Sequence, residues 1–131
     1  MSNTISINKK NKIKILDQRQ LPFKEKYIIT DNYKVVIAAI KNLSVRGAPA
    51  IGVAGAFASF LALNELKDKQ NFILEIRRRL KQIERSRPTA VNLSWAIKRF
   101  YYILSGQNKT LDYLKKKFLQ EALTIEKEEK N

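Results

Sequence analysis

The chain has 131 residues, a length typical of one domain that buries a real hydrophobic core. Its apolar fraction of 44% and charged fraction of 29% are those of a soluble globular protein. Cysteine and histidine are both missing from the sequence. This excludes disulfides and thiolate metal sites, and it removes the commonest general base, so a complete enzyme is the less favoured reading of this chain alone.

The formal net charge of +14 raises the question of a nucleic-acid or membrane partner. The excess is mostly lysine scattered along every segment, and no aromatic and basic stacking platform stands out. We therefore interpret the lysines as a solvated surface and do not expect nucleic acid as the main partner. The first eleven residues are polar, with no signal peptide, and the apolar run 48–63 is shorter than the ~20 residues of a membrane span. These features predict a cytoplasmic protein without a membrane partner.

Two short strands are expected after a loose, lysine-rich lead-in over residues 1–12. Residues 12–17 alternate polar and apolar side chains, and residues 26–30 have the composition of a second strand. Pro22, within 21–23, marks a turn or strand edge between them. The two strands are predicted to pair as a small antiparallel ribbon that lies against the helices.

Helical periodicity covers most of the remaining chain. The second of the predicted helices is apolar nearly all round, which places it at the centre of the domain. Gly52 and Gly55 within it offer a flat side for a neighbouring helix. The consecutive arginines at 77–79 fan around the third helix and are interpreted mainly as a solvated face. The predicted fold is a mostly helical α+β domain over 13–131, with helices at 33–43 (capped by Thr30 or Asp31), 49–66, 71–85, 88–104 and 111–128 (capped by Thr110), then a charged tail.

One unusual stretch, Val45–Gly52, packs an arginine, two glycines and a proline ahead of the central helix. Pro49 suits the first helical turn, and Gly47 permits a conformation or a close approach that a side chain would block. A helix start presents unpaired N–H groups and partial positive charge, and Arg46 adds a guanidinium suited to phosphate. The alternative is a tight helix start with a solvent-facing arginine.

A second stretch, Arg85–Leu93, repeats the pattern. Arg87 stands ahead of Pro88, which is taken to mark another helix start, and Asn92 follows one turn later. If the two helix starts meet, their N–H groups and the two arginines would form a phosphate clamp, with Asn92 near a sugar hydroxyl. Two ordinary helix caps remain the alternative.

The runs Leu16-Asp17-Gln18 with Leu21-Pro22, Val45 to Val53, and Arg87 to Leu93 with Trp95-Ala96 resemble the S-methyl-5-thioribose-1-phosphate isomerases. These are the aldose–ketose isomerases of methionine salvage. The resemblance extends from about Lys12 to Ile125 and corresponds to the amino-terminal domain of that family. It implies that Arg46, Gly47, Ala48 and Arg87 contact the sugar phosphate, with no metal or organic cofactor, and that the full-length protein is a homodimer.

The resemblance also implies what this chain lacks. The family uses a cysteine and an aspartate from a Rossmann-like carboxy-terminal domain, and neither they nor that domain are present in these 131 residues. We therefore expect a substrate-binding part that is inactive alone. Two alternatives within the same superfamily remain open: a non-catalytic module like the regulatory subunits of a translation-initiation exchange factor, and part of a ribose-1,5-bisphosphate isomerase.

Overall fold

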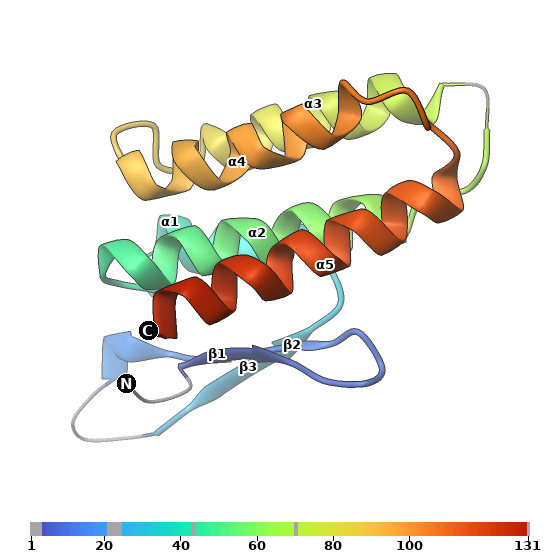
Figure 1. Cartoon of the computed structure of the whole chain (residues 1–131). Coiled ribbons are helices and arrows are strands. Elements are labelled where there is room, and N and C mark those ends of the chain that lie inside the picture. Colours follow the sequence, from blue (N-terminus) through green and yellow to red (C-terminus); the bar gives the residue numbers. More distant parts are fainter. Residues whose placement is uncertain (1–3, 21–24, 43, 70, 131) are drawn as a thin grey trace.

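The computed structural model describes residues 4–20, 25–42, 44–69 and 71–130. A small β-sheet lies beneath two layers of helices (Figure 1). The strands are β1 (Ile5–Ile7), β2 (Ile13–Leu16) and β3 (Tyr27–Thr30), in the order β1-β2-β3 with both pairs antiparallel. The predicted turn at 21–23 falls outside the described residues.

Strand β1 is a correction to the sequence-based expectation of a loose lead-in and a two-stranded ribbon. Ile5 pairs with Ile15 of β2, and Ile15 pairs with Ile28 of β3, so three isoleucines cross the sheet in one row. Ile5 and Ile15 are buried and Ile28 is half-buried. Residues 5–7 alternate apolar and polar side chains, but the run is short and lysines follow it in the sequence. It forms a strand because the neighbouring β2 offers both hydrogen-bond partners and an apolar face.

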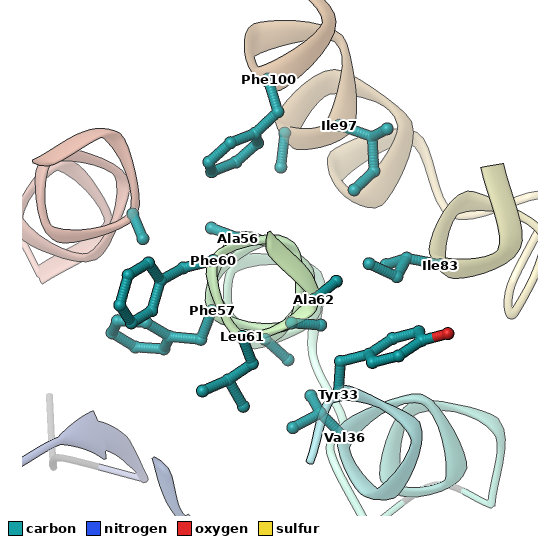
Figure 2. Packing of buried hydrophobic residues seen from close by; sticks show 14 of the residues in the cluster. Tyr33, Val36, Ala56, Phe57, Phe60, Leu61, Ala62, Ile83, Ile97 and Phe100 are labelled. Atoms are coloured by element: carbon teal, nitrogen blue, oxygen red, sulfur yellow. The ribbon is translucent and has the colours of Figure 1, made fainter. Parts of the chain in front are cut away.

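Helix α2 (Ala48–Asn64) is the centre of the domain, as predicted, and every residue from Ala50 to Leu63 is buried. Figure 2 looks along this helix and shows side chains from the surrounding helices directed at it: Tyr33 and Val36 on one side, and Ile83, Ile97 and Phe100 on others. A helix with no polar face is stable only with apolar neighbours all round, which explains the arrangement.

The other helices are α1 (Tyr33–Lys41), α3 (Phe72–Glu84), α4 (Val91–Leu104) and α5 (Leu111–Lys130). The single turn η1 (Gln18–Gln20) follows β2. The cap of α1 is Asn32, whose side chain accepts the Lys34 N–H at 2.9 Å, and neither Thr30 nor Asp31 takes this role. Among the described helices, none combines the length and apolarity needed to cross a bilayer.

The charged end of the sequence is helical rather than a free tail. Arg99 of α4 binds Glu121 and, at 2.8 Å, Glu128, and both glutamates lie on α5. These ion pairs attach the last turns of α5 to α4. Glutamate and lysine are also good helix formers, so the helix continues beyond the predicted end at 128.

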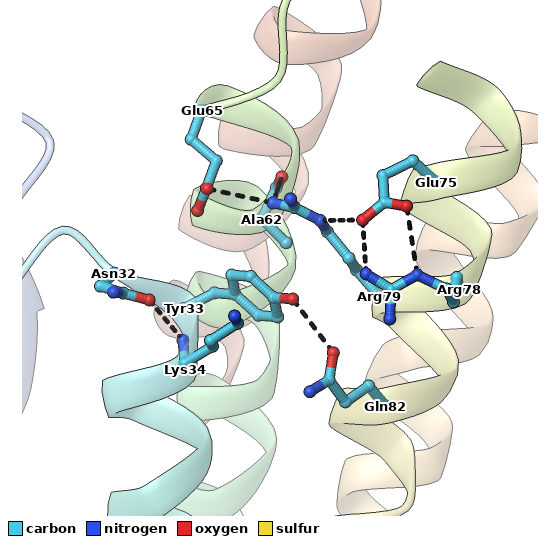
Figure 3. A network of polar contacts seen from close by, with 9 residues as sticks. All are labelled: Asn32, Tyr33, Lys34, Ala62, Glu65, Glu75, Arg78, Arg79 and Gln82. Carbon is cyan, nitrogen blue, oxygen red and sulfur yellow. Dashed lines mark hydrogen bonds and ion pairs between the residues drawn. The ribbon is translucent and has the colours of Figure 1, made fainter. Parts of the chain in front are cut away.

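The interpretation of the arginine run on α3 as mainly solvated holds for Arg77 and Arg78, which are exposed, and is wrong for Arg79. Arg79 is 14% exposed at its side chain and bonds Glu75, Glu65 and the Ala62 carbonyl, the last at 3.1 Å (Figure 3). Arg78 pairs with Glu75 but stays exposed. Hydrogen bonds from Arg78 and Arg79 lower the pKa of Glu75 to about 2. This network joins α3 to the end of α2.

Candidate functional site

The start of α2 has the backbone geometry that the first motif predicts. Gly47 is the N-cap with φ of 90°, a left-handed conformation that side-chain-bearing residues rarely adopt, and Pro49 lies within the first turn. The Ile51 N–H donates to the Gly47 carbonyl at 3.0 Å. The N–H groups of Ala48 and Ala50 therefore precede the helical hydrogen-bond ladder, and of these two residues Ala48 is exposed while Ala50 is buried.

Arg46 is held from the sheet side by Gln18. The Arg46 N–H donates to Gln18 Oε1 at 3.1 Å, and Arg46 Nη2 donates to the Gln18 carbonyl at 2.7 Å. The Gln18 N–H in turn donates to the Ser44 carbonyl at 2.9 Å. Arg46 itself remains exposed, so its other guanidinium N–H groups face solvent. Gln18 was not among the residues predicted for the site, although it belongs to one of the runs that carry the family resemblance.

The residues beside Gln18 are locked by an ion pair. Asp17 is 3% exposed and accepts from Arg19 Nε at 3.0 Å and from Arg19 Nη2 at 2.7 Å. The Asp17 N–H donates to the Lys26 carbonyl at 2.7 Å, which ties the end of β2 to β3. These bonds from Arg19 lower the pKa of Asp17 to about 2 despite its burial. The turn that carries Gln18 is thus a rigid element.

The starts of α2 and α4 lie against each other, as the two-motif prediction requires. A Cβ placed on Gly52 would be 3.3 Å from the Asn92 carbonyl and 3.5 Å from Asn92 Cβ, and a Cβ on Gly55 would collide with Leu93. The two glycines therefore let the first turn of α4 approach α2 closely. Asn92 is half-buried at this contact.

The second motif needs one correction. Pro88 does not begin α4: the Ala90 N–H donates to the Arg87 carbonyl at 2.9 Å, so Pro88 occupies the second position of a tight turn before the helix. Ala90 is the cap residue, and its side chain makes no capping bond. Arg87 is half-buried, and no hydrogen bond or ion pair of its guanidinium occurs within the described part of the chain. Among the described residues it is thus a cation without an internal partner, in the turn just before α4 begins.

A separate hollow of about 760 Å³ lies between α4 and α5 and is lined partly by Trp95, Arg99 and Tyr113. None of the five predicted site residues lines it. Val91 and Trp95 of α4 are 78% and 43% exposed. The candidate site and this hollow are therefore different features of the molecule.

The chemical groups at the two helix starts are of the kinds that bind a small anion. Free N–H groups, helix dipoles and two arginines supply positive potential and hydrogen-bond donors, and a phosphate group needs both. No carboxylate is among the five predicted residues, and neither histidine nor cysteine exists in the sequence. The five predicted residues are therefore of types that suit anion binding, and they include no acid–base pair.

Comparison with known proteins assigns the family. Residues 44–131, two thirds of the chain, match the Initiation factor 2 subunit family. Methylthioribose-1-phosphate isomerase 2 of Pseudothermotoga lettingae is 43% identical over 121 residues, which is 92% of this chain and 35% of that protein. The chain belongs to the Initiation factor 2 subunit family, and it spans about a third of the length of the curated relatives it matches.

Two solved structures share the fold described above. The 5-methylthioribose 1-phosphate isomerase from Pyrococcus horikoshii aligns with a TM-score of 0.89 and 34% identity, over 95% of this chain and 36% of that one. The translation initiation factor eIF-2B subunit delta from A. fulgidus aligns with a TM-score of 0.85 and 32% identity over the same shares. The similarity to the first confirms the fold class that the sequence predicts.

Proposed function

We propose that this chain is the amino-terminal, phosphate-binding part of an isomerase that converts 5-methylthioribose 1-phosphate to 5-methylthioribulose 1-phosphate. The observation that supports the proposal is the contact of Gly52 with Asn92, which packs the first turn of α4 against the second turn of α2, a few residues after Arg87 and Arg46 in the sequence. Relatives named methylthioribose-1-phosphate isomerase that match along most of the chain support the choice of substrate.

Within this proposal each site residue has a defined role. Arg46 and Arg87 bind the phosphate oxygens, and the N–H groups of Gly47 and Ala48 add uncharged donors at the start of α2. Asn92 is the second residue of α4, and its amide is proposed to reach a sugar hydroxyl. The ligand is held by these groups without a metal ion or an organic cofactor.

Binding is the limit of what these residues supply. Moving a proton or hydride between two sugar carbons requires an acid–base pair beside the reacting atoms, and the site has none. We therefore propose that the chain binds the substrate and does not turn it over. In this view the remaining two thirds of the length seen in relatives provide the reacting groups.

An amide NMR titration of the 131-residue chain with 5-methylthioribose 1-phosphate tests the proposal. We expect the signals of Gly47, Ala48 and Asn92 to shift together, while those of the Arg79 network stay in place. Inorganic phosphate should shift the signals of Gly47 and Ala48 more weakly, since it lacks the sugar. An absence of shifts at the start of α2, or shifts confined to the hollow between α4 and α5, would reject this site.

A parallel assay for ketose formation tests the second half of the proposal. No turnover above the uncatalysed rate is expected from the chain alone, and measurable turnover would show that it carries its own acid–base pair. The likeness to an initiation factor subunit keeps a non-catalytic regulatory module as the second candidate. That module would leave all the amide signals above unchanged, because its role does not require the sugar phosphate.

A further inference from the structure

Gln18 touches the segment that carries Arg46 at three points, from a different layer of the fold. Its backbone N–H binds the Ser44 carbonyl, its side chain binds the Arg46 N–H, and its carbonyl accepts Arg46 Nη2 at 2.7 Å. Arg46 and Gln18 are 28 residues apart in sequence, so this is a tertiary contact. It joins the sheet to the start of the central helix.

These contacts fix both the backbone and the side chain of Arg46. The side-chain amide fixes the Arg46 backbone immediately before Gly47, whose φ of 90° turns the chain into α2. The carbonyl of Gln18 holds one terminal nitrogen of the guanidinium and leaves other donors directed elsewhere. An arginine held in this way has already lost rotamer freedom before a ligand arrives, which lowers the entropy cost of binding.

Asp17 and Ser44 make Gln18 a rigid support rather than a loop residue. Asp17 is buried and bidentate to Arg19, and Ser44 is fully buried. The Ser44 Oγ also donates to Asn42 Oδ1 at 2.6 Å, at the end of α1. The segment that carries Gln18 and the segment that carries Arg46 are therefore each held by further hydrogen bonds to neighbouring residues.

We infer that Gln18 is a positioning residue of the phosphate site: it orients Arg46 and sets the backbone turn at Gly47 for an incoming phosphate. The inference rests on the proposed function, because it names a residue that acts through Arg46 and does not itself bind the ligand. It also gives a physical reason for the Leu16-Asp17-Gln18 run, which the five predicted residues leave unexplained.

The test compares Gln18→Ala with Gln18→Glu, and uses Gln107→Ala, an exposed residue of the α4–α5 turn, as the matched control. Amide hydrogen exchange at Arg46 in the ligand-free chain is measured first. Gln18→Ala should speed this exchange because the acceptor is lost, whereas Gln18→Glu keeps an acceptor oxygen and should restore protection. Exchange in the core of α2 should stay unchanged in all three variants.

Affinity for 5-methylthioribose 1-phosphate is measured next. Gln18→Ala should bind about fivefold more weakly than the unmodified chain, the effect of one lost orienting hydrogen bond. Gln107→Ala should bind normally. Normal affinity in Gln18→Ala, or Arg46 exchange that does not change, would overturn the inference while the proposed function stands. A complete lack of binding by the unmodified chain would instead overturn the proposed function, and the role of Gln18 with it.

Discussion

At the scale of single residues, the most constrained polar group is the carboxylate of Asp17. It is buried, and Arg19 supplies both a backbone and two side-chain donors. The hydrogen bond from the Arg19 side chain is the main reason that its pKa falls from the ordinary 3.8 to about 2. The folded state therefore prefers the ionised form of Asp17 more strongly than the unfolded state does.

Replacing Asp17 with Asn keeps the shape and removes the charge. We expect the free energy of unfolding at neutral pH to fall by about 1–2 kcal/mol, a modest figure because Arg19 is partly exposed and screened by solvent. The contribution of the carboxylate is fully present above pH 3.8 and is lost as the pH falls through about 2. Urea unfolding at a series of pH values should show the difference from the unmodified chain shrinking over that range. A difference that stays constant with pH would contradict this account.

At the scale of elements, the contact between α2 and α4 shows where sequence reasoning succeeds. Two glycines in a buried helix are costly for helix stability, at about 1 kcal/mol each, so the sequence predicts either close packing or the approach of a ligand at these positions. The structure places Asn92 and Leu93 against them. Pro88 was misassigned because proline suits both the first turn of a helix and the second position of a tight turn, and local sequence does not separate the two.

Arg79 illustrates what local sequence cannot give. Three consecutive arginines look alike in the sequence, yet only Arg79 faces the end of α2, and its guanidinium also lies 4.9 Å from the ring centre of Tyr33. The orientation of α3 around its own axis decides which arginine is buried. Strand β1 was missed for a related reason, because its stability depends on a partner strand eight residues away rather than on its own composition.

Arg79→Ala should destabilise the chain by about 2 kcal/mol, since it removes the donor to the Ala62 carbonyl and leaves Glu75 with Arg78 as its one arginine partner among the described residues. Arg78→Ala is the matched control, because Arg78 shares the Glu75 partner but its side chain is 61% exposed. Its effect on the free energy of unfolding should be small compared with that of Arg79→Ala, because an exposed ion pair is screened by solvent. Chemical denaturation of both variants measures these effects. Equal losses in the free energy of unfolding would mean that the burial of Arg79 adds nothing to stability.

At the scale of the whole molecule, the two ends of the central helix α2 have different surroundings. The end of α2 is closed by the Arg79 network (Figure 3). The start of α2 lies beside the start of α4 and the end of α5 (Figure 1). The proposed site therefore lies at the end of the domain where α5 finishes.

The general architecture was accessible from the sequence because its central helix has no polar face and its neighbours each have one apolar stripe. The chemistry of the site was less accessible. Composition and helix-start physics led to an anion, and only the long motifs pointed to a sugar phosphate. Gln18 was not predicted as a site residue because a single uncharged glutamine does not stand out in a sequence. Its contacts with Arg46 form only when the sheet and the helices pack together.

The central claim is that Arg46 and Arg87 bind one phosphate together. Calorimetric titration of 5-methylthioribose 1-phosphate into the unmodified chain, Arg46→Ala, Arg87→Ala and the double variant tests it, with Arg77→Ala as a charge-matched control on exposed α3 surface. Each single variant should lose at least about tenfold in affinity, and the double variant should lose less than the product, because both arginines share one ligand group. Affinities of Arg46→Ala and Arg87→Ala equal to that of Arg77→Ala would contradict the account.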